Sequence, residues 1–576
     1  MPVLNPDIAR VFDEIADLLE IEDANPFRVR AYRNAARLVQ GLSRDVKTMV
    51  EAGEDLTELP GIGEDLAKKM IEMVTTGHCS FLEKLKKQTP PALAELLKVP
   101  SLGPRRVKAL WHELDVETVE QLARAAQEKR IRNIPGFGEK TEARILEALQ
   151  AHLAAVPRFP IAIAAPYAAA LVRYLQSIPG VRRVVVAGSF RRGKDTVGDL
   201  DILATAAADS PVMERFITYE DVAEVLSHGT TRATVILHNK LQVDLRAVDE
   251  SAYGAALHYF TGSKTHNIAI RRMGQNMGLK VNEYGIFRGK ERIAGDTEES
   301  VYAAVGLPYI EPELRENRGE LQAARAGHLP ELVTRGDVRG DLHAHSKASD
   351  GHYSLQDMAA AAKAAGLEYL AITEHSRHLT VAHGLDPVRL RRQMDEIDAF
   401  NRERNGITLL KGIEVDILED GRLDLPDGIL SDLDLVVAAV HSQFDLPRGK
   451  QTARILKAMD SPHFTILAHP TGRLIGSRKP MDVDMSRVIR HARERGCFLE
   501  INAQPERLDL VDIHARMAKE EGVLLAVNTD AHSIYDFANL HFGLQQAQRG
   551  WLEKKDVLNT RTLKELRPLL AAAKSH

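Results

Sequence analysis

Residues 188 to 201, with the sequence GSFRRGKDTVGDLD, bring cationic and anionic side chains close together along the chain. Arg191 and Arg192 lie in a predicted turn bounded by glycines, and Asp199 and Asp201 follow two positions apart. Backbone amides and arginines in such a turn can hold a triphosphate. Carboxylates can hold the divalent metal ions that accompany a triphosphate. The stretch therefore predicts phosphoryl-transfer chemistry on a metal-bound triphosphate.

A third carboxylate lies in a later segment that is also predicted to be a strand. Residues 198–206, GDLDILATA, and 240–248, KLQVDLRAV, both have strand-like patterns, and the second contains Asp244. The preceding residues 182–188, RRVVVAG, predict a buried strand that ends in glycine. Because alternate residues of a strand share one face, the two aspartates of 198–206 should point the same way while Leu200 enters the core. Three carboxylates on adjacent strands can hold two magnesium ions for in-line phosphoryl transfer, whereas an isolated pair is often only a solvated strand end.

The histidines are concentrated in the last part of the chain, where fourteen of the 22 lie after residue 340. Apolar, strand-like segments there end repeatedly in residues that can bind metals, and helical segments such as 354–366 lie between several of them. Repeated strand–helix units with ligands at the strand C-termini predict a barrel with its site at that end. A single histidine at a strand end is more often structural, but here the pattern recurs, and mixed imidazole and carboxylate ligands favour zinc, manganese or iron over calcium. The candidates are His343, His345, Asp350, His375, Glu414, His441, His469, Asp530 and His532.

The first 150 residues predict helices throughout. Three segments there, 59–70, 99–110 and 134–146, each have a proline, a short turn with glycine and then a helix. This pattern resembles the helix-hairpin-helix motif, in which glycines allow close approach to DNA phosphates and helix amides donate to them. Three ordinary helical corners are the alternative. The glycines concerned are Gly61, Gly63, Gly103, Gly136 and Gly138.

Length and composition limit the class of protein. A chain of 576 residues is too long for one core and predicts several domains. The net charge is −5 and none of the three main parts is basic overall, so DNA binding would have to use local patches, backbone amides and metal ions. The only cysteines, Cys79 and Cys497, argue against a disulfide framework and fit a reducing cytoplasm. No apolar run approaches the ~20 residues that span a bilayer, so we expect no membrane partner.

The stretch 188–201 resembles the nucleotidyltransferase signature of the X-family DNA polymerases, the group that contains polymerase beta. Residues 259–271, YFTGSKTHNIAIR, and 281–287, VNEYGIF, resemble two further segments of that family. The resemblance extends over about residues 1–315, and its motifs are specific. It implies a helical DNA-binding domain followed by a polymerase palm and thumb.

The resemblance also implies a role for each matching residue. Asp199 and Asp201 would bind both catalytic metal ions, and Asp244, oriented by Arg246, would bind the one beside the primer 3′-hydroxyl. Arg271 would contact the minor groove of the template. Around the incoming nucleotide, the implied residues are Ser189, Arg192 and Gly198 at the phosphates, Tyr259, Phe260 and Gly262 at the sugar, and Asn267 at the base edge.

The sequence departs from the family pattern at several positions. Val197 and Lys264 replace a serine near the phosphates and an aspartate beside the nucleotide pocket. In the N-terminal part, Lys69 aligns with the family's Schiff-base lysine, which attacks the aldehyde of an abasic sugar. Arg28 and Asp65 replace lysines that bind the 5′-phosphate there, so lyase activity stays open. The alternative for Lys69 is a solvated helix face.

The last part of the chain, from about residue 340 to 570, resembles the PHP (polymerase and histidinol phosphatase) domain. By this resemblance the candidate ligands would bind a cluster of three metal ions, and every ligand position is filled. Such a cluster supports hydrolysis of a phosphoester. The substrate could be a small phosphorylated metabolite, but fusion to a polymerase favours a DNA end. We therefore expect a 3′→5′ exonuclease, with 3′-phosphatase and AP-endonuclease activity as further options.

These patterns predict an all-α DNA-binding domain, an α+β nucleotidyltransferase palm with a thumb, and a distorted β/α barrel. The expected enzyme is a DNA-directed DNA polymerase that fills short gaps in base-excision repair and carries a 3′→5′ exonuclease. The alternative is a DNA-end binding scaffold, or a PHP nuclease or phosphatase with a weak or inactive polymerase half. The expected domains are 1–150 (helical, DNA-binding), 151–250 (palm), 251–315 (thumb and nucleotide selection), 316–339 (linker) and 340–576 (PHP).

The expected cofactors and partners follow from this interpretation. Two Mg²⁺ or Mn²⁺ ions would serve the polymerase site, and Mn²⁺ or Zn²⁺, as a cluster of three ions, would serve the PHP site. The partners would be gapped or primed double-stranded DNA and dNTPs. We expect a monomer that works in the cytoplasm, at the nucleoid.

Overall fold

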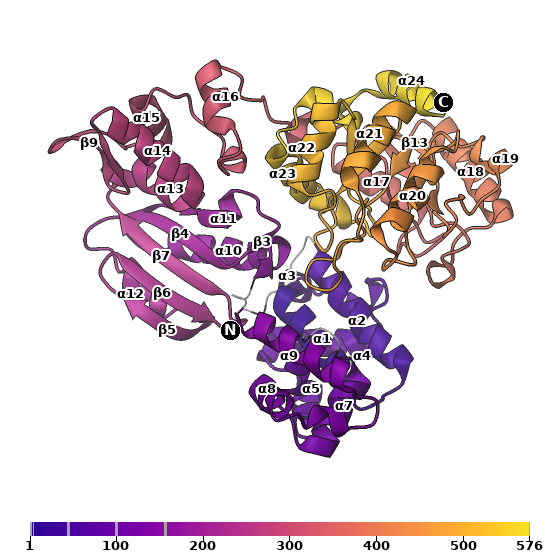
Figure 1. Ribbon diagram of the computed structural model, residues 1–576, viewed down its shortest axis with the longest axis horizontal. Helices are drawn as coiled ribbons and strands as arrows, with labels where there is room; N and C mark the ends of the chain where they lie inside the picture. Colours follow the sequence, from indigo (N-terminus) through magenta and orange to yellow (C-terminus); the bar gives the residue numbers. More distant parts are fainter. Residues whose placement is uncertain are drawn as a thin grey trace. The chain divides into compact units, whose positions relative to one another are not determined.

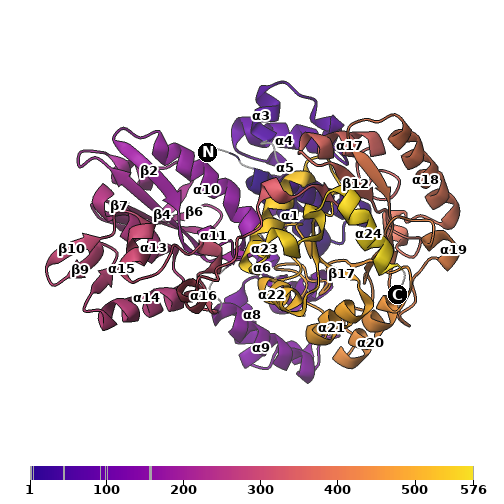
Figure 2. The same cartoon turned by 90° about the horizontal axis from the view of Figure 1, so that it is seen from above.

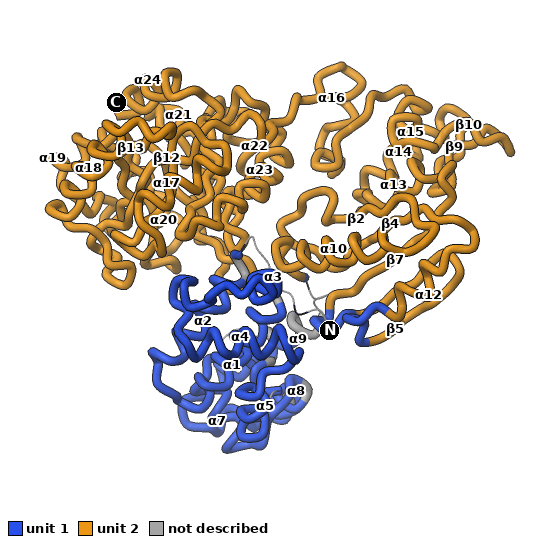
Figure 3. The backbone as a smooth tube through the Cα atoms, turned by 180° about the vertical axis from the view of Figure 1, so that it is seen from behind, with its two compact units in different colours: residues 1–158, 219–223, 237–240 blue, residues 159–218, 224–236, 241–576 orange. Residues whose placement is uncertain are grey.

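The computed structural model describes residues 3, 5–42, 46–90, 92–97, 99, 102–154 and 158–574. Its contacts divide the chain into two compact units (Figure 3). The first unit comprises Met1–Arg158 with two short later segments, Tyr219–Ala223 and Leu237–Lys240, and the second comprises the rest of the chain. Within the described residues, no helix is both long enough and apolar enough to cross a membrane.

The N-terminal part of the first unit is built from helices, as its sequence predicts. In α1 (Asn5–Ile21), the residues Ile8, Phe12, Ile15 and Leu19 are buried because apolar side chains recur every three or four positions. That helix packs closely against α2. The remaining helices are α2 (Pro26–Gly41), α3 (Val46–Glu51), α4 (Glu64–Thr76), α5 (Ser80–Lys86), α6 (Leu93–Leu96), α7 (Pro104–Leu114), α8 (Val119–Gln127) and α9 (Glu139–Ala154).

A five-stranded mixed sheet follows, with strand order β2-β4-β7-β6-β5 (Figure 1). Its central strands β4 and β7 run parallel, so the three predicted carboxylates lie on adjacent strands. Helix α10 packs on β2 and helix α13 packs on β4. The strands are β2 (Val181–Val186), β4 (Asp199–Ala206), β5 (Val222–His228), β6 (Arg232–Leu237) and β7 (Gln242–Val248), and the helices are α10 (Ile161–Gln176), α11 (Gly188–Arg191), α12 (Val212–Ile217) and α13 (Tyr253–Thr261).

One prediction for this sheet is wrong, because β2 is not a buried strand. It lies at the edge of the sheet, so only one of its sides is paired. Arg182 and Arg183 are exposed there and pair with Glu250, at 2.6 Å (Nη1 to Oε2) and 3.5 Å (Nη2 to Oε1). The valines that follow are only half-buried. An apolar run alone therefore did not distinguish an edge strand from a central one.

The thumb region combines helices with a small antiparallel sheet of order β10-β9-β8. Ile270 and Tyr302 are fully buried in its core. Leu321 and Ala324, from the segment that the sequence predicts as a linker, pack in the same core. The elements are α14 (Lys264–Asn276), β8 (Lys280–Asn282), β9 (Gly285–Arg288), β10 (Glu291–Ala294), α15 (Glu298–Ala304) and α16 (Glu320–Ala326), and a separate short pair joins β1 (Phe159–Pro160) to β3 (Thr196–Val197).

The C-terminal part is a distorted β/α barrel, as predicted. Its strands are all parallel and form two sheets, β11-β12-β13 and β14-β15-β16-β17-β18. Isolated bridges from Ala344 to Ala531 and from His375 to Glu414 join the ends of the two sheets. The strands are β11 (Gly340–Asp341), β12 (Tyr369–Ile372), β13 (Thr408–Lys411), β14 (Glu414–Asp416), β15 (Val437–Ala439), β16 (Ile466–Leu467), β17 (Phe498–Asn502) and β18 (Leu525–Asn528).

Alternate strand residues of the barrel enter two different apolar clusters. Leu370 and Ile372 pack with residues of the surrounding helices, whereas Tyr369 and Ala371 pack with Leu566 of the last helix. Figure 2 shows β12 and β17 enclosed by these helices. The helices are α17 (Leu355–Ala364), α18 (Pro387–Arg402), α19 (Asp427–Leu430), α20 (Arg448–Met459), α21 (Met485–Arg495), α22 (Asp512–Glu521), α23 (Leu540–Arg549) and α24 (Leu563–Ala573).

Candidate functional sites

Asp199, Asp201 and Asp244 converge at one end of the palm sheet. Asp201 on β4 lies directly opposite Asp244 on β7, and one carboxylate oxygen from each of the three residues lies within 4.8 Å of the others. Leu200, between the two aspartates of β4, is fully buried, as the strand pattern predicts. Burial and the negative charges of Asp199 and Asp244 raise the pKa of Asp201 to about 7. A divalent cation would relieve this repulsion, so the donor set fits metal binding.

The backbone before these carboxylates requires a glycine. Gly188 has φ +61°, and a Cβ atom there would lie 2.2 Å from Asp201 Oδ2. The neighbouring Ala187 amide donates to the Asp201 carbonyl at 2.6 Å. The single helical turn α11 can therefore begin against the carboxylate only because residue 188 has no side chain.

The structure gives Asp244 partners that the sequence did not suggest. Thr234 Oγ1 donates to Asp244 Oδ1 at 2.6 Å, and Gln242 Nε2 donates to Asp244 Oδ2 at 2.7 Å. Arg232 adds a contact of 3.3 Å (Nη2 to Oδ1). The guanidinium of Arg246, the predicted orienting residue, instead lies 4.3 Å from the centre of the Phe260 ring. The antiparallel pairing of β6 with β7, which sets Thr234 opposite Asp244, was the signal that could have found these partners.

The predicted nucleotide-pocket residues lie on three neighbouring segments. Ser189 belongs to α11, Gly198 precedes β4, and Gly262 follows α13, where a Cβ atom would lie 3.2 Å from Arg192 Nη1. Tyr259 and Phe260 meet edge to face, with ring centres 5.1 Å apart. The residues predicted at the phosphates therefore lie next to those predicted at the sugar, and Arg192 is the point of contact with Gly262.

The predicted base-side residues also lie at this edge. Asn267 Nδ2 donates to the Tyr259 carbonyl at 2.6 Å, while its Oδ1 is buried and accepts no hydrogen bond from the described residues. The Arg271 guanidinium lies 5.0 Å from the centre of the Tyr259 ring. A polar atom without a partner at this point is consistent with a ligand contact.

The candidate ligands of the barrel converge at the C-terminal ends of its strands. Donor atoms within 4.8 Å of one another form three groups, which share His345 and His375. His469, outside these groups, lies 2.9 Å from Glu414 (Nε2 to Oε1). The groups are His345 with Asp350, His375 and His532; His343 with His345 and Asp530; and His375 with Glu414 and His441.

The electrostatics of this cluster fit cation binding. Both ring nitrogens of His345, together with Glu414 Oε2 and Asp530 Oδ1, are buried without a hydrogen bond from the described residues. Burial and the neighbouring imidazoles of His532 and His375 lower the pKa of His345 to about 3. Such buried lone pairs are stabilised by coordination, so the donor set suits transition metals.

Buried carboxylates behind the ligands were missed by the sequence analysis. Glu500, fully buried on β17, lies 2.7 Å from His343 Nδ1 (Oε1) and accepts from the His469 amide at 2.7 Å (Oε2). Asp416 Oδ1 lies 3.1 Å from His441 Nδ1. Contacts of this kind fix the ring orientation, so that Nε2 faces the metal cluster. The glutamate within the apolar strand FLEIN (498–502) was the available signal.

An arginine also lies beside the cluster. Arg507 Nε is 3.8 Å from Asp530 Oδ2, and its buried Nη1 has no hydrogen-bond partner among the described residues. A guanidinium at a metal cluster is suited to a phosphate oxygen.

The predicted hairpin glycines lie at helix starts in the first unit. Gly61 and Gly136 have φ of +73° and +85° in turns that precede α4 and α9. Gly63 and Gly103 are the N-caps of α4 and α7, and neither supplies a side-chain cap. No side chain of these two residues caps the first amides, so a phosphate could accept from them at α4; at α7 fewer donors remain, because Pro104 has no amide hydrogen and the Arg106 amide donates to the Gly103 carbonyl at 2.9 Å.

The helix starts after Gly103 and Gly138 have the same backbone hydrogen bonds, because the Gly103 carbonyl accepts from the Arg106 and Val107 amides at 2.9 and 3.0 Å. Gly138 directly precedes α9 and accepts from the Thr141 and Glu142 amides at 2.9 and 3.0 Å. In the middle hairpin, Pro100 and Ser101 lie outside the described residues.

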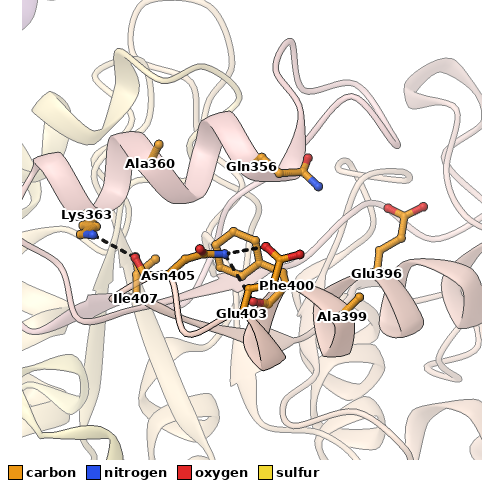
Figure 4. Close-up of a pocket in the computed structure, with 9 residues that line it drawn as sticks. All are labelled: Gln356, Ala360, Lys363, Glu396, Ala399, Phe400, Glu403, Asn405 and Ile407. Carbon is orange, nitrogen blue, oxygen red and sulfur yellow. Dashed lines mark hydrogen bonds between the residues drawn. The ribbon is translucent and has the colours of Figure 1, made fainter.

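A surface hollow of about 500 Å³ lies away from all of these groups (Figure 4). It is formed between α17 and α18, where Lys363 donates to the Asn405 carbonyl at 2.9 Å. Its lining combines Phe400 with Glu396 and Glu403 and includes none of the predicted site residues. It is a gap between helices rather than part of either metal site.

Comparison with known proteins finds a relative that matches almost the whole chain, from the helical part to the barrel. A relative from Bacillus subtilis (strain 168), named DNA polymerase/3′-5′ exonuclease PolX, is 39% identical over 568 residues, which cover 98% of this chain and 99% of that protein. This chain belongs to the X-family DNA polymerases with a PHP domain. The matching family models are a helix-hairpin-helix domain (3–79), a SAM-like helix-hairpin-helix tandem (93–151), the DNA polymerase beta palm (158–274), the DNA polymerase beta thumb (256–316) and the PHP domain (341–504).

Shorter relatives match the PHP part of this X-family polymerase alone. A protein of Thermoanaerobacter sp. (strain X514), named "Probable phosphatase", is 30% identical over 234 residues, 38% of this chain and 89% of that protein. One from Caldanaerobacter subterraneus with the same description is 29% identical over 231 residues, 38% of this chain and 86% of that protein. The PHP barrel thus also occurs without a polymerase. Polymerase and exonuclease activity in this family implies divalent metal ions, DNA and dNTPs.

The lyase-type lysine of this X-family polymerase is engaged within the first unit. Lys69 Nζ pairs with Asp65 Oδ1 at 2.5 Å and lies 5.1 Å from the centre of the Phe81 ring. Tyr32 is buried, and Arg28 lies over the same Phe81 ring. Lys69 is therefore not on a solvated helix face, and its Nζ, the atom that would form a Schiff base, is engaged by the Asp65 carboxylate.

Proposed function

We propose that this X-family polymerase fills short gaps in DNA during base-excision repair and removes nucleotides from the same primer end with its PHP domain. The convergence of Asp199, Asp201 and Asp244 beside Arg192 supports the synthetic activity. The substrate would be a gapped or primed duplex with a dNTP. The helix-hairpin-helix turns would hold the DNA backbone through amides rather than through a broad positive field, in keeping with the net charge of −5.

In the polymerase reaction, Asp199 and Asp201 would hold two Mg²⁺ or Mn²⁺ ions, and Asp244 would hold one of them. When bound, these ions supply charge stabilisation for in-line transfer of the nucleotidyl group. Thr234 and Gln242 hold the carboxylate of Asp244 in one orientation. Such fixed donors reduce the reorganisation needed when the primer 3′-hydroxyl attacks.

Nucleotide selection would depend on the turn after α13. Arg192 and Ser189 would contact the phosphates, and Tyr259, Phe260 and Gly262 would restrict the space at the sugar. Asn267 Oδ1 would contact the base edge, and Arg271 the template minor groove. The buried, unpaired Oδ1 is the observation that supports this arrangement.

For the PHP site we propose 3′→5′ exonuclease activity with a cluster of three Mn²⁺ or Zn²⁺ ions. When bound, the ions supply an activated water and an electrostatic site for the phosphate. Glu500 and Asp416 orient His343 and His441, and Arg507 would contact the scissile phosphate. Activity as a 3′-phosphatase or AP endonuclease is a second candidate, favoured by the relatives that are named phosphatases.

The remaining assignments follow from the substrate. We propose that the protein acts as a monomer on the bacterial chromosome, in the cytoplasm. Lys69 is the only lysine that we propose for an abasic-site lyase, and its pairing with Asp65 makes this activity weak.

The experiment that tests the function uses a gapped duplex with a labelled primer, manganese and all four dNTPs. Three proteins are compared: wild type, Asp199→Ala/Asp201→Ala and His343→Ala. We expect the first variant to lose extension and keep shortening, and the second to do the reverse. If wild type neither extends nor shortens the primer, the alternative of a DNA-end binding scaffold is favoured instead.

A further inference from the structure

The predicted phosphate-binding arginine is occupied by protein groups in this structure. Arg192 Nη1 donates to the Thr261 carbonyl at 2.5 Å, and its Nε donates to Glu316 Oε1 at 3.1 Å. Both ionic side chains are largely buried, with 13% and 14% of their surface exposed. A triphosphate that binds Arg192 must therefore compete with a carboxylate already in place.

The same carboxylate is held by the PHP domain. Arg549 on α23 donates from Nη1 to Glu316 Oε1 at 3.0 Å and to the Arg192 carbonyl at 2.8 Å. Its Nη2 donates to Asp512 at 2.6 Å, and only 2% of its side chain is exposed. Figure 2 shows α11 and α23 side by side. One oxygen of Glu316 thus accepts from an arginine of the polymerase site and from an arginine of the PHP barrel.

The Glu316 oxygen lies between two cations, Arg192 and Arg549. Burial raises the pKa of Glu316, but Arg192 and Arg549 outweigh it and hold the pKa below its ordinary value, so the carboxylate is ionised. Burial and the nearby Arg549 lower the pKa of Lys194. Because Arg549 attracts Glu316 and repels Arg192, it weakens the pair between those two residues.

The adjacent arginine provides a contrast. Arg191 donates to Glu298 at 2.6 Å (Nη2 to Oε2) and to Thr261 Oγ1 at 2.7 Å, and Glu298 also binds the fully buried Arg315. These partners all belong to the palm and thumb. Arg192, by contrast, is connected to Arg549 of the PHP domain, through Glu316 at its side chain and directly at its backbone carbonyl.

We infer that Glu316 is an intramolecular competitor of the nucleotide triphosphate for Arg192, and that Arg549 is a positioning residue that draws Glu316 away. The PHP domain thereby sets the affinity of the polymerase site for dNTP. This inference rests on the proposed polymerase function and adds a link between its two domains. It assigns neither residue a contact with the reacting atoms.

Steady-state gap filling with varied dNTP tests the inference through opposite changes in KM. Glu316→Gln removes the competing charge, so we expect KM for dNTP to fall about fivefold, since a partly desolvated ion pair contributes of the order of 1 kcal/mol. Arg549→Gln leaves Glu316 entirely to Arg192, so KM should rise by about the same factor. The double variant should behave like Glu316→Gln, because Arg549 reaches the guanidinium of Arg192 through that carboxylate, and its other contact is with the Arg192 backbone carbonyl. We expect kcat to stay within about twofold, because no reacting group is altered.

Asp195→Asn is the matched control. It breaks another carboxylate–arginine pair between the palm and the PHP barrel, Asp195 with Arg473 at 2.9 Å, without touching Arg192. Its KM should equal that of wild type. Thermal melting of every variant checks folding, and Arg549→Met, which also removes the charge but keeps a long aliphatic side chain, replaces Arg549→Gln if the latter does not fold.

Calorimetric titration of each full-length variant with a Mg²⁺-dNTP, without DNA, separates the inference from the proposed function. The expected order of affinity is Glu316→Gln, then wild type, then Arg549→Gln or Arg549→Met. If this order holds while wild type extends no primer, the link stands and the polymerase function falls. If Glu316→Gln binds dNTP more weakly than wild type, or if both single variants match wild type, the competition does not exist.

Discussion

The two metal centres of this X-family polymerase are built from different donors. The palm centre has three carboxylates, of which Asp199 and Asp201 are half-buried. The PHP centre has mostly imidazoles, and His343 and His345 are fully buried. Oxygen-only donors suit hard ions such as Mg²⁺, which keep several waters, whereas imidazoles favour Mn²⁺ or Zn²⁺.

The centres also differ in what surrounds the ligands. Two of the PHP imidazoles are supported from behind by carboxylates, His343 by Glu500 and His441 by Asp416, so their rings are already oriented for a metal ion. In the palm centre the carboxylates repel one another, and Asp201 has a pKa of about 7. A bound divalent cation would relieve this repulsion. The predictions below test this contrast.

The largest effect is expected from the palm carboxylates. Asp201→Asn should reduce primer extension by about a thousandfold, the equivalent of about 4 kcal/mol of lost transition-state stabilisation. Primer shortening should not change. Because the variant removes one of three repelling charges, its melting temperature in a chelator should be no lower than that of wild type. Extension within tenfold of wild type would contradict the assignment of Asp201 as a metal ligand.

A smaller loss of activity is expected when the carboxylate that supports a PHP ligand is replaced. Glu500→Gln should lower exonuclease activity and Mn²⁺ affinity by about 10- to 100-fold, because His343 loses the carboxylate that fixes its ring. The readouts are primer shortening without dNTP at increasing Mn²⁺, and the metal content of the purified protein. Glu368→Gln, which changes a half-exposed glutamate of the same domain, is the control. Equal activity of the two variants would show that the support behind His343 is dispensable.

The sequence predicted the candidate ligands of both centres but not the residues that support them. The ligands themselves followed from strand periodicity and from their recurrence at strand ends, and the family resemblance named them all. Glu500, Asp416 and Thr234 were missed, because a polar residue within an apolar strand does not indicate what it faces until the neighbouring strand is known. The pairing of Arg192 with Glu316 joins residues 124 positions apart and has no local signal.

The exposure of β2 and the partner of Arg246 show the same limitation. Both depend on which elements lie beside a segment, and neither is encoded in its pattern. The resemblance assigns Arg246 a family role, which stays a prediction, and the structure adds that its guanidinium lies over Phe260. The sequence therefore indicated the residue types that could carry chemistry, whereas the contacts that orient them came from the structure.

The next substitution, with an intermediate expected effect, tests whether the palm carboxylates must be held in one orientation, as the PHP imidazoles are. Thr234→Val keeps the shape of the side chain but removes the donor to Asp244, so we expect extension to slow about tenfold, as for a lost hydrogen bond to a charged group. Thr205→Val is the control, because Thr205 is equally buried on β4 but its hydroxyl has no partner among the described residues. If both variants extend at the same rate, the orientation of Asp244 comes from elsewhere.

The smallest effect is expected in the hairpins, which we propose hold the DNA. They should serve both centres equally. Gly61 has φ +73° with no atom within 4 Å of an added Cβ, so Gly61→Ala strains the backbone without a clash. Shifted amides should weaken binding of gapped DNA about fivefold, since such strain is of the order of 1 kcal/mol. Gly53→Ala is a matched control, because Gly53 has φ +72° and equally open space outside the hairpins. Both variants should lose similar stability, but only Gly61→Ala should raise the Kd for DNA, measured by fluorescence anisotropy. At saturating DNA, extension and shortening should then return to wild-type rates together, since the hairpin positions the substrate for both sites and takes part in neither reaction.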